Sequence, residues 1–311
     1  MTEHLPTLVV SGYASVDYAM QLAPFEGHHA TTTVRSRADE WPRYGGIAHV
    51  TRAAARAAGG AVRVAALSWV GGDAEGEAWV RAVETGGADT SGVARSGSRS
   101  PSAHLLYPEG QGAICLFDPG DCHADRLTAA QRELLATADA AVVTVGPEET
   151  TRELLTAIPA GAPVFWIVKQ DPASLTAELV AELASRARLV TLSEGERGYL
   201  ETVAAAAAPG AYVVVTRGSE GAELLRVGPG CELTGVGSVP AQPVTGVDTT
   251  GAGDTFSGTL VALLAAGGDP EPEEMLAHLA AASDATARML SERRPDPDLQ
   301  TDHQRDEKRN A

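Results

Sequence analysis

The sequence has few basic residues, and this scarcity excludes two classes of partner. Lys and Arg total 24 against 41 Asp and Glu, which gives a formal net charge of −17. A chain with this balance is unlike the basic proteins that bind the phosphate backbone of nucleic acids or an anionic membrane surface. We therefore expect neither nucleic acid nor membrane as a partner.

Cysteines and long apolar runs are also scarce. Cys115, Cys122 and Cys231 are odd in number and form no CxxC pair, so we expect neither a disulfide framework nor a zinc site. No apolar run reaches the about 18 residues that a membrane span needs. The first residues have neither the basic region nor the apolar stretch of a signal peptide. These features predict a cytoplasmic protein.

The alternation of apolar runs and helical patterns predicts the fold class. With 311 residues, 44 % of them hydrophobic and 21 % charged, the chain has the composition of a globular protein. The patterns predict strands at residues 8–10, 62–70, 140–145, 164–168, 189–192 and 212–216, and helices at 46–58, 75–85, 148–157 and 175–186. Such alternation is typical of an α/β fold with a mostly parallel sheet covered by helices on both faces.

Two polar, turn-rich stretches, 17–44 and 98–118, interrupt this alternation. The second contains apolar segments on either side of the turn Pro108–Gly112, which is typical of a β-hairpin. We expect both stretches to form a small sheet that covers one edge of a single domain spanning residues 1–290. Residues 291–311 are polar, with Leu299 as their only large apolar residue, and are predicted to be a disordered tail.

The segment VDTTGAGDTFSG, which begins at Val247, is the part of the sequence most informative about chemistry. It precedes an apolar helical pattern at 259–266. A turn of small residues at a helix start exposes backbone N–H groups, which bind an anion together with the helix dipole. The turn Gly251–Gly253 lets a phosphate approach closely, and the carboxylate of Asp254 is suited to accept a proton from an attacking hydroxyl. The alternative is structural, with Asp254 as a helix N-cap and the glycines as a tight turn.

Other phosphate-binding motifs fit less well. The sequence has no GxxxxGK[ST] loop. The sixth position counted from Gly251 is Phe256, where a dinucleotide-binding fingerprint has glycine.

The segment Asp248–Asp254 (DTTGAGD), followed by Thr-Phe, resembles the C-terminal signature of the ribokinase-like (PfkB) sugar kinases. Four other segments resemble motifs of this family in the same order: Gly12–Asp17, Tyr44–Gly46, Ser193–Glu196 and Val213–Gly221. Together they extend over roughly residues 5–290. The resemblance implies a ribokinase-like three-layer α/β/α sandwich with a mostly parallel central sheet and a small β-sheet lid.

The resemblance also implies roles for individual residues. Asp254 would be the general base, and the anion hole for the transferred phosphoryl group would consist of Gly251, Ala252 and Gly253. The residues expected to bind substrate are Asp17, Gly45, Gly46, His49, Val50 and, on the lid, His104. Those expected to border ATP are Ser193, Glu196, Thr216, Gly218 and Gly221. Mg²⁺ would bridge the phosphates, with Glu196 acting through water. Asp248 and Thr250 resemble a loop that often holds a monovalent cation such as K⁺.

The sequence departs from the family pattern at three places. The glycine signature usually has Asn at the position of Val50, and the adjacent His49 takes that place only if the register shifts. Ser193 stands where the Asn-x-x-Glu motif has Asn. Residues 169–172 contain only part of an Asp-x-Asn-x-Arg-like motif of sugar-acid and fructose kinases.

The resemblance favours an ATP-dependent kinase that phosphorylates a hydroxyl of a sugar or sugar-like compound. A nucleoside kinase of the adenosine or pseudouridine type is the alternative, and a non-catalytic sensor of sugar or nucleotide is a third hypothesis. The lid residues His104, Tyr107 and Phe117 are candidates to contact either the substrate or a second subunit. An apolar lid face favours pairing with a second lid, so we expect a homodimer.

The acidic composition extends to the proposed phosphate site. Residues 244–284 contain seven acidic residues and no Lys or Arg. Phosphate binding there would depend on backbone amides, the helix dipole and Mg²⁺, with Lys169 or Arg217 as additional basic groups. The sequence therefore predicts a strict dependence on divalent metal.

Overall fold

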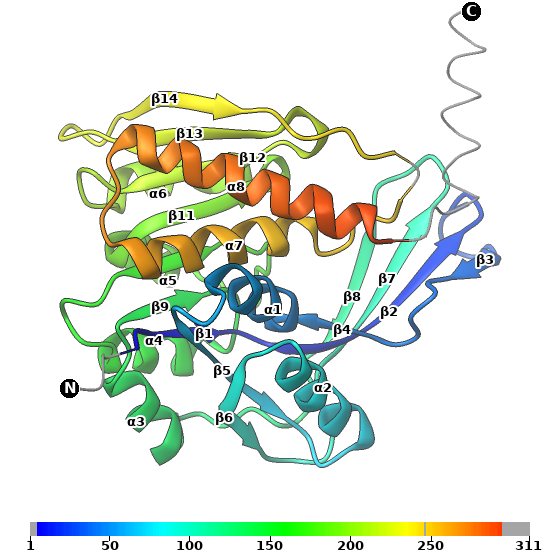
Figure 1. The fold of residues 1–311 in the computed structure, drawn as a ribbon. Helices are drawn as coiled ribbons and strands as arrows, with labels where there is room; N and C mark the ends of the chain where they lie inside the picture. Colours follow the sequence, from blue (N-terminus) through cyan, green and yellow to red (C-terminus); the bar gives the residue numbers. More distant parts are fainter. Residues whose placement is uncertain (1–4, 246, 294–311) are drawn as a thin grey trace, which may run out of the picture.

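The structure, a computed structural model, describes residues 5–245 and 247–293. It confirms the expected α/β architecture (Figure 1). In the described residues, a large sheet has the strand order β14-β13-β12-β11-β10-β9-β1-β5-β6, and a smaller sheet has the order β3-β2-β7-β8 with β4 paired to β2.

The large sheet is parallel from β12 to the edge strand β6, and its inner strands are the buried apolar runs that the sequence predicts. The parallel strands are β1 (Thr7–Ser11), β5 (Arg63–Val70), β6 (Asp89–Arg95), β9 (Ala140–Val143), β10 (Val164–Ile167), β11 (Ala187–Ser193) and β12 (Tyr212–Thr216). One edge is antiparallel and consists of β13 (Ala222–Val227) and β14 (Leu233–Val239). The sequence patterns do not predict this edge because much of β14 is glycine or exposed polar residues.

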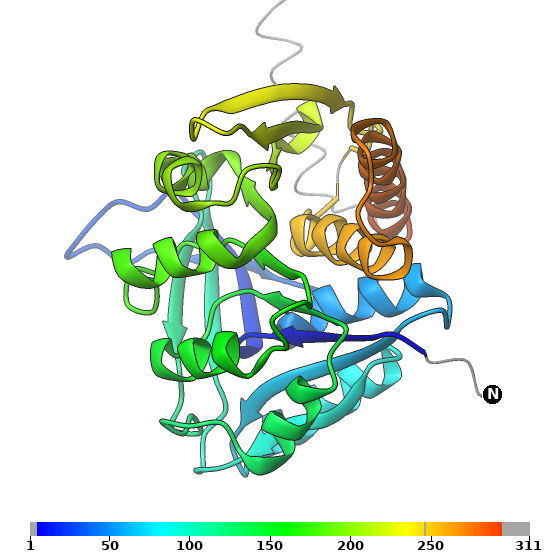
Figure 2. The ribbon, with the colours of Figure 1, turned by 90° about the vertical axis from the view of Figure 1, so that its left-hand side faces the viewer.

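Helices cover both faces of the large sheet (Figure 2). One face packs against α1 (Ile47–Ala58), α2 (Ala74–Thr85), α7 (Ala252–Gly267) and α8 (Pro272–Ser291). The other packs against α3 (Ala129–Ala136), α4 (Glu148–Ala157), α5 (Ala177–Arg186) and α6 (Leu200–Ala206). Helix α7 begins at Ala252, earlier than the predicted 259, so the small residues of the signature belong to its first turns.

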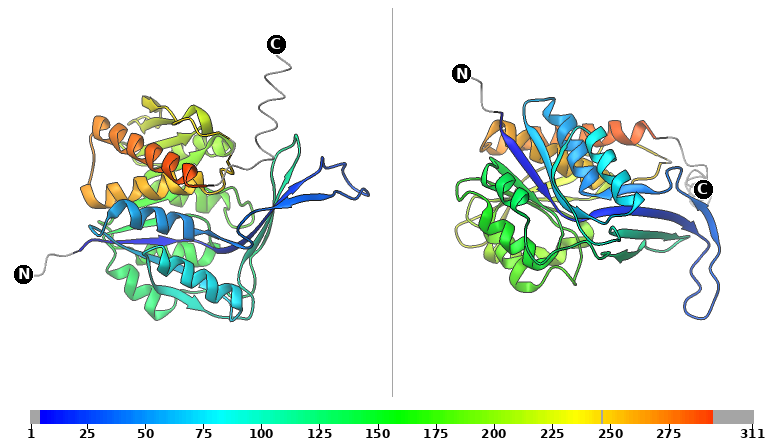
Figure 3. Two further views of the ribbon diagram at one scale, coloured as in Figure 1. Left: turned by 45° about the vertical axis from the view of Figure 1, so that its right-hand side comes forward. Right: turned by 90° about the horizontal axis from the view of Figure 1, so that it is seen from below.

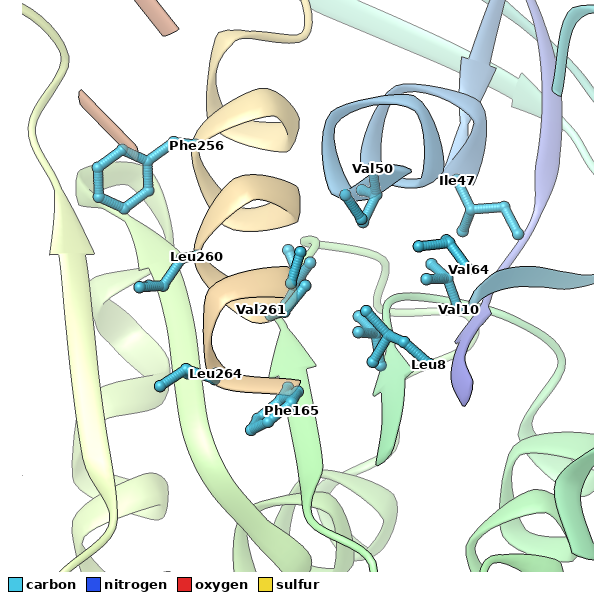
Figure 4. Packing of buried hydrophobic residues seen from close by; sticks show 14 of the residues in the cluster. Leu8, Val10, Ile47, Val50, Val64, Phe165, Phe256, Leu260, Val261 and Leu264 are labelled. Carbon is cyan, nitrogen blue, oxygen red and sulfur yellow. The ribbon is translucent and has the colours of Figure 1, made fainter. Parts of the chain in front are cut away.

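Helices α1 and α7 approach each other closely. A Cβ atom at Gly258 of α7 would lie 2.5 Å from the backbone oxygen of Val50 in α1, so only glycine fits there. Figure 4 shows Val50 and Val261 among the apolar side chains between these helices and the sheet. This contact fixes the start of α7 relative to the start of α1.

The smaller sheet corresponds to the predicted lid and projects from the main body (Figure 3). Its strands are β2 (Ala14–Leu22), β3 (Val34–Arg37), β4 (Arg43–Gly46), β7 (Ser102–Pro108) and β8 (Ile114–Asp118). Strands β7 and β8 form the predicted antiparallel hairpin. Strand β2 follows β1 after only two residues and pairs in parallel with β7, so the lid is joined directly to the centre of the large sheet.

The predicted tail lies mostly outside the described residues, which end at Arg293. Ser291 is still part of α8, and Arg293 makes defined hydrogen bonds, so the ordered chain extends past the expected limit at residue 290. The described chain contains no helix that is both long and apolar enough to cross a membrane.

Candidate active site

The candidate site lies where parallel strands of the large sheet end. Lys169 follows β10 by two residues, Ser193 is the last residue of β11, and Thr216 is the last residue of β12. Carboxyl ends of parallel strands lie at one edge of a sheet, which is where α/β folds bind ligands. The N-terminus of α7 meets this edge, because Lys169 contacts Asp254 in its first turn.

The start of α7 has the geometry of an anion site. Gly251 is its N-cap, with φ of 76°, a left-handed conformation that favours glycine. No side chain in the described chain caps this helix. In its first turn the N–H of Ala252 donates to the backbone oxygen of Thr249 at 3.0 Å. The N–H groups that follow Ala252 remain for an anion, and the helix dipole adds positive potential there. Gly253 is exposed, so a ligand can reach these groups.

Asp254 forms an ion pair with Lys169. Asp254 Oδ1 lies 2.6 Å from Lys169 Nζ, and the two side chains are 14 % and 41 % exposed. Burial alone would raise the pKa of Asp254, but the charge and hydrogen bond of Lys169 outweigh it and hold the pKa below its ordinary value. Burial would likewise lower the pKa of Lys169, but Asp254 and Glu196 raise it. Both groups are therefore charged at neutral pH. The sequence indicates Lys169 only as an additional basic group and does not predict this pair.

Asp17 is a buried carboxyl group that faces the glycine signature. It lies in the middle of β2, not in a turn, and the residue is 7 % exposed. A Cβ at Gly45 would lie 1.8 Å from its Oδ2 atom, so glycine is needed at that position. The pKa of Asp17 is raised to about 6, mainly by burial and to a smaller degree by the charge of Asp254. The hydrogen bond that Ser15 donates to Asp17 lowers this pKa but does not outweigh burial. The carboxyl groups of Asp17 and Asp254 thus belong to one electrostatic site.

The structure brings His49, and not Val50, to the signature turn. A Cβ at Gly251 would lie 3.2 Å from the imidazole ring of His49. Val50 is fully buried between α1 and α7 (Figure 4). The expectation that Val50 contacts substrate is therefore corrected. Because α1 begins at Ile47, directly after Gly46 with its φ of 58°, His49 lies in the first turn and Val50, one residue on, faces the core. Burial lowers the pKa of His49, so its ring is neutral at neutral pH.

The residues expected to border ATP follow β11 and β12. Glu196 accepts hydrogen bonds from the backbone N–H of Ser193 at 2.7 Å and from its hydroxyl at 2.8 Å. The hydroxyl of Thr216 donates to the backbone oxygen of Leu192 at 3.4 Å, which joins the two strand ends. The turn between β12 and β13 contains Gly218 and Gly221, both with positive φ. These expected positions therefore lie at the ends of two adjacent strands and in the segments that follow them.

The lid residues divide between two faces. Tyr107 and Phe117 lie on the face of Asp17: the Tyr107 hydroxyl is 3.2 Å from the hydroxyl of Thr250, and the rings of Phe117 and Tyr13 are 5.0 Å apart. His104 lies on the opposite face, where its ring stacks on Tyr18 at 5.2 Å. Residues alternate between faces along a strand, and His104 is in register with Tyr18, the neighbour of Asp17. The structure therefore does not bring His104 to the candidate site.

The loop before α7 is held by two arginines that the sequence patterns do not indicate. Arg43 of β4 pairs with the carboxylate of Asp248, and Arg293 donates to the backbone oxygens of Asp248 and Thr250. A cavity of about 1320 Å³ between the lid and helices α1, α7 and α8 reaches these arginines and His49. Asp17 and Asp254 do not line it, so it lies beside the candidate catalytic groups and not over them.

Comparisons with known proteins agree with this geometry. The sequence pattern described as pfkB family carbohydrate kinase matches residues 10–293. The chain therefore belongs to the pfkB family of carbohydrate kinases, whose members are phosphotransferases. A search of curated proteins gave no significant match.

Solved structures with the same fold include ribokinases and a nucleoside kinase. A putative ribokinase from Agrobacterium tumefaciens is 22 % identical, with a TM-score of 0.70, and the alignment covers 93 % of this chain and 92 % of that one. The ribokinase from Arabidopsis thaliana, complexed with ribose and ATP, is 20 % identical, with a TM-score of 0.66 over 90 % and 92 % of the two chains. The nucleoside kinase from Burkholderia thailandensis, in complex with inosine, is 18 % identical, with a TM-score of 0.67 over 94 % of each chain.

Proposed function

We propose that this protein is an ATP-dependent kinase that phosphorylates a hydroxyl group of a sugar or sugar-like small molecule. The observation that supports this best is the charged Asp254–Lys169 pair at the uncapped start of α7. In the proposed reaction, Asp254 takes the proton of the substrate hydroxyl. The resulting oxygen attacks the γ-phosphorus of ATP, and the bond from that phosphorus to the bridging oxygen of ADP breaks.

The remaining groups position the substrate and stabilise charge. The N–H groups of the turn Gly251–Gly253 would bind the transferred phosphoryl group, and Lys169 would add positive charge beside it. Asp17 would accept hydrogen bonds from substrate hydroxyls, and these bonds are stronger to its ionised form. Because burial raises the pKa of Asp17 to about 6, substrate binding is expected to weaken below that pH.

Mg²⁺ fits this site only as an ion that arrives with the nucleotide. The described residues include no group of three or more His, Cys, Asp or Glu side chains placed to hold a metal ion. Mg²⁺ commonly binds to one or two carboxylates and the substrate phosphates, and Glu196 is the expected carboxylate. When bound, the ion would neutralise phosphate charge. We expect turnover to stop in excess EDTA.

The central test is a screen of ATP consumption with pentoses, hexoses and nucleosides, followed by the variant Asp254→Asn. This variant should lower kcat by about 10²–10⁴-fold, the usual scale for a general base, while nucleotide binding persists. Asp269→Asn, in an acidic residue of the same segment that is 75 % exposed, is the matched control and should leave kcat unchanged. Undiminished turnover by Asp254→Asn would overturn the assignment. Binding of sugar or nucleotide without turnover in the wild type would favour the sensor hypothesis.

A nucleoside is the second candidate substrate, and the ring of Phe117 favours it. Phe117 lies on the same lid face as Asp17 and is partly exposed, so it offers a surface for stacking a base. If the substrate is a nucleoside, Phe117→Ala should raise its KM and leave the KM of a free sugar unchanged. An equal effect on both would indicate that the ring only supports the lid.

We also propose that the protein is a cytoplasmic homodimer that pairs through the lid. Four of the five exposed large hydrophobic side chains among the described residues belong to the lid region: Phe25, Val34, Leu116 and Phe117, of which Phe117 lies on the face of Asp17. Leu116 is 56 % exposed and lies on the lid face opposite Asp17. Pairing through that outer face would cover Leu116 and leave the candidate site open.

A further inference from the structure

The two carbonyl groups of the loop before α7 point to a single guanidinium group. Arg293 Nη2 donates to the backbone oxygen of Thr250 at 2.8 Å, and Arg293 Nη1 donates to that of Asp248. Arg293 follows the end of α8 by two residues, whereas the loop immediately precedes α7. A planar guanidinium can bridge two acceptors in this way, because its donors have a fixed fork geometry.

The carboxylate of Asp248 is also fully engaged. Its Oδ1 atom accepts hydrogen bonds from the backbone N–H of Thr250 at 2.8 Å and from the Thr250 hydroxyl at 2.7 Å. Its Oδ2 atom pairs with Arg43. Burial would raise the pKa of Asp248, but these bonds outweigh it and keep the group ionised. Three oxygen atoms of this loop are therefore bound by two guanidinium groups. They are the backbone oxygens of Asp248 and Thr250, bound by Arg293, and Asp248 Oδ2, bound by Arg43.

This arrangement does not fit a bound monovalent cation. A K⁺ ion at these oxygens would have to displace the guanidinium of Arg293 and would lie beside the positive charge of Arg43. Like charges at such short range repel strongly where solvent is partly excluded. The resemblance of Asp248 and Thr250 to a cation-holding loop is therefore not matched by the contacts around them.

We propose that the guanidinium of Arg293 takes the place of a monovalent cation and fixes the loop from Asp248 to Gly251, so that the protein needs no K⁺. The proposal assigns Arg293 as a positioning residue. It holds the carbonyls of the loop that ends at Gly251 and thereby orients the N–H groups of the first turn of α7. The activity part of its test rests on the proposed kinase function, but the thermal-unfolding part does not.

The cavity beside the loop makes chemical rescue feasible. Arg43, Asp248 and Arg293 all line this cavity of about 1320 Å³. Removing the Arg293 side chain would open the two carbonyls to that space, where a free guanidinium ion or K⁺ can enter. Arg288 lines the same cavity and is exposed on α8, so Arg288→Ala is a matched control for lost positive charge.

The experiment compares the wild type, Arg293→Ala and Arg288→Ala in potassium chloride and in tetramethylammonium chloride of equal ionic strength. The wild type should show the same kcat in both salts, within about twofold. Arg293→Ala should lose at least about tenfold in kcat in tetramethylammonium, the scale of a lost charge-assisted hydrogen bond. Millimolar guanidinium, and to a smaller degree K⁺, should restore it. Arg288→Ala should behave as the wild type. Several-fold activation of the wild type by K⁺, or full activity of Arg293→Ala without rescue, would overturn the proposal.

Two readouts remain if no substrate is found or if Arg293→Ala does not fold. Millimolar guanidinium should raise the thermal unfolding midpoint of Arg293→Ala but not that of the wild type, and this measurement needs no turnover. Arg293→Lys keeps the charge but not the fork, so it should show a smaller loss and the same rescue by guanidinium. A wild-type midpoint that rises in K⁺ relative to tetramethylammonium would show that a cation binds beside Arg293 and would refute the idea.

Discussion

The buried carboxyl group of Asp17 should reduce the stability of the folded protein at neutral pH. Its pKa is raised by burial to about 6, from 3.8 for the free side chain. The folded state therefore binds this proton more tightly than the unfolded state does. The resulting stability is fully present below a pH of about 4 and is lost as the pH rises through about 6. At about 1.36 kcal/mol per pH unit, the ionised group costs about 3 kcal/mol above that range.

The variant Asp17→Asn should remove this cost. Asn has nearly the same shape and can still accept the hydrogen bond from Ser15. At a pH of about 8 we expect the free energy of unfolding to rise by up to about 3 kcal/mol, and the thermal midpoint by roughly 5 °C. At a pH of about 5 the gain should fall to about half, because the wild-type carboxyl is then largely protonated in the folded state.

Urea unfolding of both proteins over this pH range measures the effect. Because the other titrating groups are the same in both proteins, their contributions cancel in the difference between the two free energies of unfolding. Working at a pH of about 5 or above keeps the net negative charge of the chain. A variant that is no more stable than the wild type at a pH of about 8, or a difference that does not shrink on acidification, would refute the reasoning. The same variant should lose substrate binding, which separates the functional need for the charge from its effect on stability.

Three further predictions concern the Asp254 pair, the helix contact and the lid. Lys169→Met should move the acid limb of the kcat pH profile, measured at saturating substrate so that Asp17 is already engaged, upward by about one pH unit, since a charge 2.6 Å from Asp254 is worth about 1.6 kcal/mol even with water-like screening; an unchanged kcat profile would contradict it. Gly258→Ala should lower the free energy of unfolding in urea by about 1–3 kcal/mol through overpacking. Gly267→Ala, where a Cβ meets nothing within 4 Å in the same helix, should be neutral or stabilising, and equal effects would contradict the contact. Leu116→Glu should convert a dimer to a monomer in sedimentation at micromolar concentration, whereas a monomeric wild type would refute the lid interface.

The parallel core could be predicted from the sequence because its strands are buried on both faces. Such strands are short, continuous apolar runs, as in β1 and β9, whose residues are all buried. The antiparallel edge has no such pattern, since β14 is partly exposed and contains two glycines. Helix α8 was not predicted either, although its Pro272 and two acidic residues form a recognisable helix start.

The candidate site was predictable where a local motif defines it. Asp254 and the turn before it follow from a short contiguous segment. The partners of the signature loop do not, because Arg43 lies 205 residues from Asp248 and Arg293 lies 45 residues away on the other side. Such pairs depend on how the sheet and helices bring distant segments together. Which of His49 and Val50 lies at the signature turn likewise depends on the residue at which α1 begins. Motif spacing alone does not determine that residue.

The order in which the chain is synthesised has a consequence for this loop. Strands β1, β5 and β9 belong to the first half of the chain and can pair before the rest is made. The loop at Asp248 gains its contact from Arg293 only after α8 has left the ribosome. A nascent chain would therefore hold a formed lid and central sheet well before the residues around Asp254 reach their final arrangement, so catalytic competence would be among the last properties acquired during translation.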